Sequence, residues 1–156
     1  VKNGIRVDQY LRASEPGIFA LGDCACFPDP RSRQMVRLES VQAAVDHAKT
    51  IADVIVNGPT TPYAAVPWFW SDQSDWKLQI AGLASATDRA VMADPFSCLR
   101  FDRDDRLTAV ETINGAKVHM TARKILERSE RPSFAELQAL QFDVVSWRKA
   151  ADLALT

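Results

Sequence analysis

The sequence predicts a mixed α+β fold in two parts, residues 1–62 and residues 63–156. Between Leu38 and Ile55, apolar residues recur with the three-and-four spacing of one helix face. The stretch that follows, "PTTPYAAVP", is rich in proline and typical of a linker. Beyond it, several segments alternate apolar and polar residues, as strands do. We therefore expect strand structure and a long helix first, and then a small α+β unit with an antiparallel sheet and helices.

The first part is expected to contain two short strands and the long helix. "GIRVDQYLRAS" predicts a strand over Ile5–Asp8 that leads into a turn. Ile18–Leu21 is a run of apolar residues between Pro16-Gly17 and Gly22-Asp23, as in a strand buried on both faces of a parallel sheet.

The long helix has clear end signals. Ser40 is a plausible N-terminal cap, and Gly58 followed by Pro59 ends the helix. His47 is expected on its polar flank. The apolar face is expected to consist of Leu38, Val41, Ala44, Val45, Ala48, Ile51, Ala52 and Ile55.

The second part is expected to mix strands and helices. "WKLQIAGL", "SCLRFDRD" and "RLTAVETIN" have strand patterns, and the last two flank a turn at "DRDDR", which predicts a hairpin. "GAKVHMTARKILERSE" predicts a helix on Val118, Ala122, Ile125 and Leu126. Ser133 with Glu136 forms a capping box for another helix, and the tail from Phe142 to Thr156 is also expected to be helical.

The composition excludes several classes of protein. The chain has 156 residues, 47% hydrophobic and 25% charged, which are ordinary values for a globular protein. A net charge of −1 implies no general attraction to nucleic acid or to an anionic membrane. We find no apolar run of membrane-spanning length and no signal-peptide pattern. Three cysteines are too few for a disulfide framework, so we expect a cytoplasmic protein.

A glycine and a carboxylate follow the strand expected at Ile18–Leu21. Gly22 would let the backbone approach a ligand closely. Asp23 would lie at the carboxyl end of a buried strand, where open α/β sheets bind ligands, and could accept hydrogen bonds from polyol hydroxyls. A plain turn at these two residues is an equally good interpretation.

The start of the long helix is a second candidate site. Its N-terminus, at Glu39 and Ser40, carries partial positive charge that suits carbonyl or phosphate groups of a ligand. From the residues alone, the simpler interpretation is favoured, in which Glu39 only complements the helix dipole.

Metal and acid–base chemistry are not indicated. His47 and His119 are the only histidines, and no cysteine or carboxylate cluster has metal-ligand spacing around either. Cys24 and Cys26 form a CxC rather than a CxxC. We therefore expect no metal ligand and no catalytic acid, base or nucleophile.

"VPWFWSDQSDWKLQIAGL" combines aromatic residues with a polar cluster. In a strand, Trp68 and Trp70 share one face and Phe69 takes the other. Buried indoles need a hydrogen-bond partner, which residues 71–73 could supply. The stretch can provide a stacking platform for a planar ring, or an apolar seal between domains, or both.

Taken together, these stretches resemble the FAD-dependent, NADH-using ferredoxin reductases of the pyridine nucleotide-disulfide oxidoreductase superfamily. This group includes the putidaredoxin-reductase-like and biphenyl-dioxygenase-reductase-like enzymes. The matching strings are "GIFALGDCA", "VRLESVQAAVDHAK", "VPWFWSDQSDWKLQIAGL" and "GIRVDQYLRAS". The resemblance extends to about Ile125. It implies that residues 1–62 are the end of a Rossmann-like FAD domain and residues 63–156 a reductase C-terminal domain.

The resemblance also implies roles for individual residues. The aspartate of the GD motif holds the ribityl chain of the flavin, and the start of the following helix lies beside the isoalloxazine ring. The second tryptophan of WFW lies against the flavin, the first is nearby, and residues 71–73 fix the loop that presents it. The cofactor-binding positions implied are Gly22, Asp23, Glu39, Ser40, Val41, Trp68 and Trp70.

Two departures from the family pattern stand out. The family carries two glycine-rich nucleotide-binding loops, whereas the six glycines here are too far apart for either. We therefore expect the C-terminal part of a reductase, inactive and unable to hold FAD tightly without the FAD and NADH domains that would precede it. Trp76 stands where the resemblance implies a smaller or aliphatic residue, which bears on the exact shape of the flavin-side pocket.

The function implied is electron transfer from NADH through FAD to a [2Fe–2S] ferredoxin that serves a P450 or a Rieske oxygenase. Candidates for a basic docking patch toward that ferredoxin are Arg31, Arg33, Arg37 and Lys77, although solvated surface charge is an equal explanation. One alternative is a non-catalytic interface or oligomerisation module that pairs with itself. Another is a reductase with a different acceptor, similar to monodehydroascorbate reductases or apoptosis-inducing-factor-like proteins.

Overall fold

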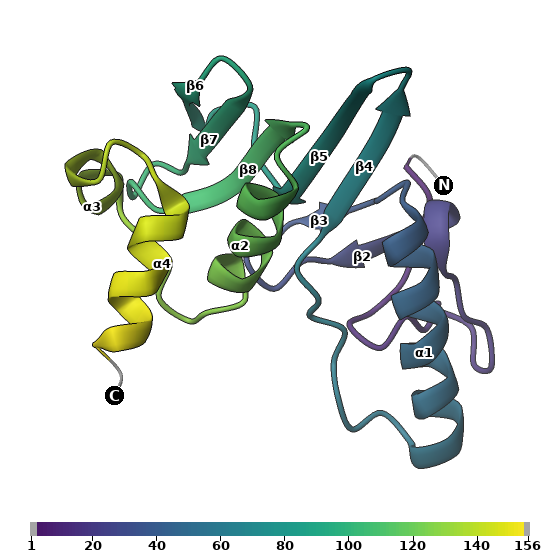
Figure 1. The fold of residues 1–156 in the computed structure, drawn as a ribbon. Helices are drawn as coiled ribbons and strands as arrows, with labels where there is room; N and C mark the ends of the chain where they lie inside the picture. The colour runs from purple at the N-terminus through teal and green to yellow at the C-terminus, as the bar shows by residue number, and fades with distance from the viewer. Residues whose placement is uncertain (1–2, 155–156) are drawn as a thin grey trace. The chain divides into compact units, whose positions relative to one another are not determined.

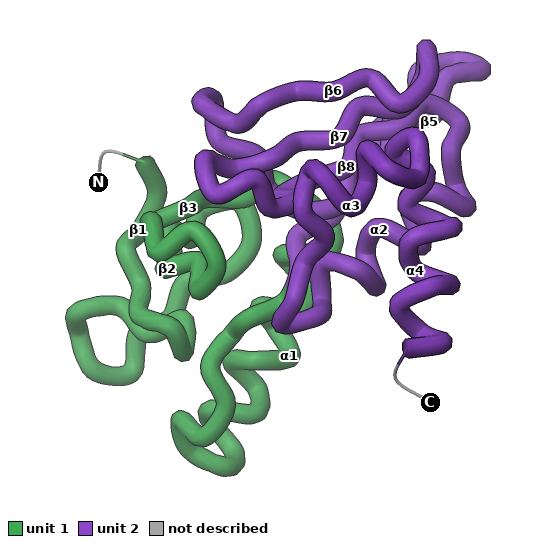
Figure 2. The backbone as a smooth tube through the Cα atoms, turned by 90° about the vertical axis from the view of Figure 1, so that its left-hand side faces the viewer, with its two compact units in different colours: residues 1–65 green, residues 66–156 purple. Residues whose placement is uncertain are grey.

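A computed structural model describes residues 3–154 (Figure 1). The chain divides between Ala65 and Val66 into two units, unit 1 (residues 1–65) and unit 2 (residues 66–156), drawn in green and purple in Figure 2. Each unit has its own cluster of buried apolar side chains. Each therefore folds around apolar contacts made within its own residues.

Unit 1 contains a small sheet with the strand order β1–β2–β3. β1 (Ile5–Arg6) runs parallel to β2 (Ala25–Pro28), and β2 runs antiparallel to β3 (Met35–Val36). β1 lies inside the strand expected at residues 5–8. The core of the unit consists of Val7, Leu11, Ala20, Ala25, Phe27, Ile51 and Tyr63.

The buried strand expected at Ile18–Leu21 is wrong. The only ladder contact described there is an isolated bridge between Arg12 and Phe19, and the two ends of the run are 53% and 43% exposed. A tight turn precedes the run, and the 3-10 helix η1 (Gly22–Cys24) follows it. These turns leave too short a segment for a strand, and the buried strand comes after η1, as β2.

Helix α1 (Val41–Asn57) confirms the long helix and both of its end signals. The Oγ of Ser40 accepts a hydrogen bond from the N–H of Ala43 at 3.1 Å, which satisfies one of the first N–H groups of the helix. Gly58 follows the helix with a φ of +80°, a conformation that favours glycine, and donates to the carbonyl of Val54 at 3.0 Å.

The covered face of α1 differs from the one expected. Val41, Val45 and Ile55 are 61%, 47% and 66% exposed. The helix carries apolar side chains on two adjoining faces, and unit 1 covers only one of them. The exposed residues Val41, Val45, Ala48, Ala52 and Ile55 are called the α1 stripe. The buried residues are Gln42, Ala43, His47, Ile51 and Val54.

Unit 2 is built on an antiparallel sheet with the strand order β4–β5–β8–β7–β6. β5 and the β7–β8 hairpin confirm the strands expected from the alternating patterns. β6 was not expected, because its short sequence has weak alternation. The strands are β4 (Trp68–Gln73), β5 (Trp76–Gly82), β6 (Arg89–Asp94), β7 (Ser97–Phe101) and β8 (Leu107–Ile113).

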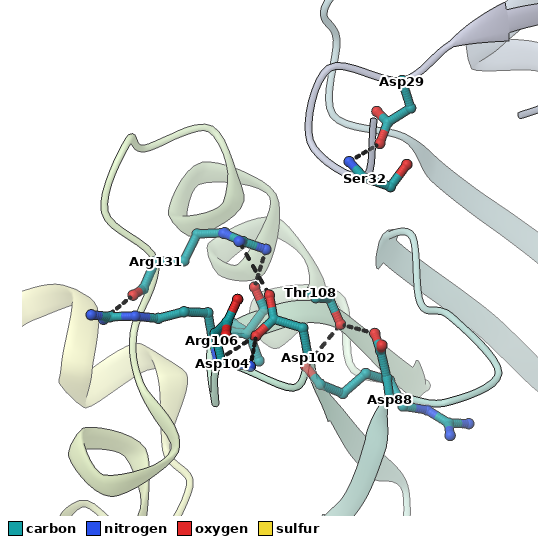
Figure 3. Close-up of polar contacts among 10 residues, drawn as sticks. Asp29, Ser32, Asp88, Asp102, Asp104, Arg106, Thr108 and Arg131 are labelled. Atoms are coloured by element: carbon teal, nitrogen blue, oxygen red, sulfur yellow. Dashed lines mark hydrogen bonds and ion pairs between the residues drawn. The ribbon is translucent and has the colours of Figure 1, made fainter. Parts of the chain in front are cut away.

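The hairpin turn between β7 and β8 is held by polar contacts (Figure 3). Oδ1 of Asp102 accepts hydrogen bonds from the backbone N–H groups of Asp104 and Arg106, at 3.0 and 2.9 Å. Oδ2 of Asp102 accepts from Arg131 at 3.4 Å, and Arg131 also donates to the carbonyl of Leu107 at 3.1 Å. The "DRDDR" turn is thus fixed by its first aspartate, which explains why the local sequence predicts it.

The helices of unit 2 confirm the expected ones. α2 (Ala116–Leu126) lies against β5 and β8, and it contributes Ala122 and Ile125 to the core (Figure 1). α3 (Phe134–Ala139) begins with the expected capping box of Ser133 and Glu136, and both of its hydrogen bonds are present. α4 (Val144–Leu153) occupies most of the tail, whose last two residues lie outside the described part. Across residues 3–154, no helix is both long and apolar enough to cross a membrane.

Candidate functional site

The first group of candidate residues lies at the turn around η1. Gly22 is buried and has a φ of +63°, and a Cβ added to it would lie 3.3 Å from the Cβ of Ala44 on α1. Glycine is therefore favoured here both by backbone conformation and by the close packing of α1. Asp23 follows with its side chain exposed. The turn, called the GD turn, begins η1 rather than ending a buried strand.

Arg37 connects three of the segments around this turn. Its Nη1 donates to the carbonyl of Asp23 at 2.9 Å and lies 2.5 Å from Oε1 of Glu39. Its Nε donates to Oδ1 of Asn3 at 3.0 Å. Arg37 was expected as a docking residue, but these contacts give its guanidinium a local structural role. The ion pair also places Glu39 beside the GD turn.

The start of α1 completes this group. Ser40 uses its Oγ as the helix cap, and Val41, the first helical residue, is 61% exposed. A helix N-terminus with an exposed apolar side chain suits a flat ligand that has electron-rich carbonyl oxygens. Arg37 and the packing of α1 on η1 therefore connect this helix start to three residues that the sequence predicted, Gly22, Asp23 and Glu39.

His47 is the residue of this region whose position was predicted wrongly. It was expected on the polar flank of the helix, but its side chain is fully buried. Its Nδ1 accepts a hydrogen bond from the N–H of Gly22 at 3.1 Å. Burial lowers the pKa of His47, and the negative charge of Asp46 opposes that shift. The imidazole is therefore neutral at physiological pH.

The second group of candidate residues lies on β4 of unit 2. Trp68 and Trp70 share one face of the strand, and their rings stack with centroids 5.4 Å apart and planes 25° apart. Trp68 is half-buried, and Trp70 is 40% exposed. The Trp70 ring is therefore partly open to solvent, and the Trp68 ring is more covered by the protein.

Helix α2 supports this pair from the inside. The guanidinium carbon of Arg123 lies 4.1 Å from the centre of the Trp68 ring, and the His119 ring meets Trp68 edge-on at 6.1 Å. Burial lowers the pKa of His119, and the positive charge of Arg123 lowers it further. Sequence reasoning missed Arg123, although its four-residue spacing from His119 indicates a shared helix face.

Residues 71–73 do not form a loop that presents the tryptophans. They continue β4, where Ser71, Asp72 and Gln73 pair with Leu78, Lys77 and Trp76 of β5. The amide of Gln73 donates to the hydroxyl of Ser71 at 3.3 Å. Strand pairing, rather than loop contacts, therefore fixes the tryptophan pair.

Trp76 does not join the tryptophan pair. It is paired with Gln73, whereas Trp70 is paired with Gln79, so strand alternation puts Trp76 on the opposite face of the sheet. Its ring packs on Phe96 with centroids 5.8 Å apart, and both are about half exposed. Trp76 therefore lies on the face of the sheet opposite to the tryptophan pair.

The remaining docking candidates, Arg31, Arg33 and Lys77, do not share a common set of contacts. Arg31 donates to the carbonyls of Ala64 and Ala65 at 2.9 and 3.2 Å, which holds the last two residues of unit 1 in place. Arg33 and Lys77 are exposed, in unit 1 and unit 2 respectively. Within the described part of the chain, no three His, Cys, Asp or Glu side chains are grouped as metal ligands.

Comparisons with known proteins match both units. The family described as "Reductase C-terminal" matches residues 68–147, and the family described as "Pyridine nucleotide-disulphide oxidoreductase" matches residues 1–48. Among curated proteins, rhodocoxin reductase of Rhodococcus erythropolis is 47% identical over 131 residues, covering 81% of this chain and 30% of the relative. Putidaredoxin reductase of Pseudomonas putida is 37% identical over 118 residues, covering 73% of this chain and 28% of the relative.

Solved structures of ferredoxin reductases also match this chain. The ferredoxin reductase for the CYP199A2 system of Rhodopseudomonas palustris has a TM-score of 0.79 and 39% identity, over 92% of this chain and 36% of that one. The reductase in the covalent putidaredoxin reductase–putidaredoxin complex has a TM-score of 0.78 and 30% identity, over 96% of this chain and 37% of that one. The chain thus spans about a third of the length of these proteins.

Proposed function

Since the chain belongs to the reductase C-terminal family, we propose that it is the C-terminal part of an FAD-dependent reductase. In this proposal the whole protein passes electrons from NADH through FAD to a [2Fe–2S] ferredoxin, which serves a P450 or a Rieske oxygenase. Unit 1 is the end of the FAD-binding domain, and unit 2 is the reductase C-terminal domain. The free cysteines suit a reducing cytoplasm.

The observation that carries the proposal is the pairing of two features in one chain. Unit 1 has an exposed carboxylate, Asp23, on a glycine turn packed against the start of α1. Unit 2 has an exposed indole, Trp70, stacked on a second indole. A flavin has one polyhydroxyl chain and one planar ring, so these are the two kinds of contact that it needs.

The residues present fit part of FAD. Asp23 would accept hydrogen bonds from ribityl hydroxyls, the N-terminus of α1 at Ser40 and Val41 would face the ring carbonyls, and Trp70 would lie against the ring. The glycine-rich loop that cradles the pyrophosphate has no counterpart among the six glycines. We therefore expect the chain by itself to bind FAD weakly.

The chemistry of the reaction comes from the cofactor. When bound, FAD converts the two-electron chemistry of NADH to the one-electron chemistry of a ferredoxin. The protein side chains bind and orient the ring and keep water from it, and none of them needs to act as an acid, base or nucleophile. Arg33 and Lys77 remain candidates for contact with an acidic ferredoxin.

A second candidate function is supported by the α1 stripe. Its exposed apolar residues are expected to be covered by the rest of an FAD domain. Without that domain the same stripe favours self-association, and the chain would act as a non-catalytic interface module.

A chimera tests the proposal. The matching segment of rhodocoxin reductase is replaced by this chain, and the protein is compared with the chain alone. We expect the chimera to retain flavin absorbance through gel filtration and to oxidise NADH, and the chain alone to lose added FAD. The Asp23→Ala chimera should lose at least about tenfold in FAD affinity, as expected for removal of hydrogen bonds to a charged group.

Two outcomes would contradict the proposal. If the chain alone retains FAD, the binding energy does not reside in the missing glycine-rich loops. If the chimera is folded but colourless, residues 1–48 do not complete a flavin site.

A further inference from the structure

We propose that His47 is a positioning residue, which holds the GD turn from the neighbouring helix in the geometry that presents Asp23. The role of Asp23 toward a flavin rests on the proposed function. The role of His47 toward the turn rests on contacts within unit 1.

The contact itself is long-range and buried. Nδ1 of His47 lies 3.1 Å from the backbone nitrogen of Gly22, 25 residues earlier in the chain. Gly22 opens η1, and the residue before it, Leu21, makes no side-chain capping bond. The first N–H groups of a helix have no partner within the helix. His47 therefore provides from α1 the acceptor that the turn itself does not provide.

The surroundings of the imidazole fix its orientation. Its ring is fully buried and meets the rings of Phe27 and Tyr63 edge-on, with centroids 4.9 and 4.5 Å away. Phe27 and Tyr63 both belong to the core of unit 1. The acceptor nitrogen is therefore held in place by packing on β2 and on the linker.

The turn is held from its other side as well. Arg37 donates to the carbonyl of Asp23, and the N–H of Ala25 donates to the carbonyl of Gly22. Together with His47, these contacts fix the N–H and the carbonyl of Gly22 and the carbonyl of Asp23. The exposed side chain of Asp23 is left to face a ligand. A purely space-filling His47 would be replaceable by a side chain of similar size without an acceptor.

Substitution of His47 by asparagine and by leucine separates an acceptor role from a space-filling role. Oδ1 of asparagine lies close to the position of Nδ1 in histidine, and leucine has nearly the same shape as asparagine but no acceptor. We expect His47→Asn to keep the hydrogen-exchange rate of the Gly22 amide within about twofold of the native rate. We expect His47→Leu to raise that rate at least tenfold, while α2 amides in unit 2 are unchanged.

The native chain gives a measurement that does not depend on a variant folding. In ¹⁵N-labelled protein, a scalar coupling between the Gly22 amide nitrogen and Nδ1 of His47 is expected, and Nδ1 should have the shift of an unprotonated nitrogen. A protonated Nδ1, or equal Gly22 exchange in His47→Leu and native protein, would overturn the proposal.

The flavin chimera separates the two proposals. Loss of FAD affinity in His47→Leu but not in His47→Asn supports both. If Gly22 exchange responds as expected while Asp23→Ala leaves FAD affinity unchanged, the positioning of the turn stands and the flavin role of Asp23 is wrong.

Discussion

Two histidines of this chain are buried in their neutral form, one in each unit. His47 accepts a hydrogen bond from Gly22, and His119 packs beside Trp68 under the positive charge of Arg123. Burial is the main cause that lowers both pKa values. A buried histidine of this kind makes the folded state bind fewer protons than the unfolded chain.

The stability of both units should therefore depend on pH near neutrality. In the unfolded chain both groups titrate near the ordinary value of 6.5, and in the folded state they titrate lower. Their contribution is complete above that pH and decreases as the pH falls from 6.5 toward the folded pKa values. Urea titrations at about pH 7.5 and about pH 5.5 should show a lower free energy of unfolding at the lower pH.

The histidine variants provide the control. His47→Asn should reduce the pH dependence of unit 1 only, and His119→Asn that of unit 2 only. A pH dependence unchanged in both variants would mean that other groups cause it.

At the scale of the elements, the sequence correctly predicted the features that are held by contacts between residues close in sequence. The capping box of Ser133 and Glu136, the cap at Ser40 and the turn after β7 are each closed by residues within four positions of one another. The strand expected at Ile18–Leu21 is wrong because turns on both sides leave too short a segment, and a run of four apolar residues does not predict those turns.

The sequence pattern also does not determine which face of α1 is covered or which residues support the candidate site. Both faces of α1 are apolar enough to be buried, and the sequence does not say which one this chain covers. The supports of the site, His47 for the GD turn and Arg123 for Trp68, lie far from their partners in sequence. Their contacts depend on packing between elements, which periodicity does not report.

Gly4 gives an element-scale prediction, because it adjoins the GD turn. Gly4 and Gly17 both have positive φ, +91° and +78°, but only Gly4 is enclosed, with a Cβ position 2.7 Å from the carbonyl oxygen of Cys24. Gly17→Ala should cost about 1–2 kcal/mol from backbone strain alone. Gly4→Ala should cost at least about 1 kcal/mol more, since β1 and η1 must separate.

The measurement is a urea titration followed by NMR signals of α1 residues, which report unit 1 alone. Gly17→Ala is the matched control because nothing lies within 4 Å of its Cβ position. Equal destabilisation by the two substitutions would show that the enclosure of Gly4 has no energetic effect.

At the scale of the whole molecule, the α1 stripe exposes a row of apolar side chains to water. Changing Val45 and Ile55 to lysine should leave the helix content of the chain unchanged, because both side chains are exposed. In sedimentation experiments at rising concentration, the double variant should self-associate less than the native chain. In the flavin chimera, the same change should lower FAD retention if the rest of an FAD domain covers the stripe, as we propose.

Ile51 provides the contrast on the same helix. It is 8% exposed, so Ile51→Ala should destabilise unit 1 by roughly 2–5 kcal/mol. If the double lysine variant destabilises unit 1 as much as Ile51→Ala does, the stripe is not an exposed surface of the chain.

The division of the apolar cores also has a consequence for recombination between related genes. One core ends with Ala65 packed against it, and the other begins with Val66. A genetic crossover between these two codons would inherit each core whole from one parent. Related proteins that share this division could therefore exchange whole units by recombination. The junction between Ala65 and Val66 is where a natural or engineered library of hybrids should be joined.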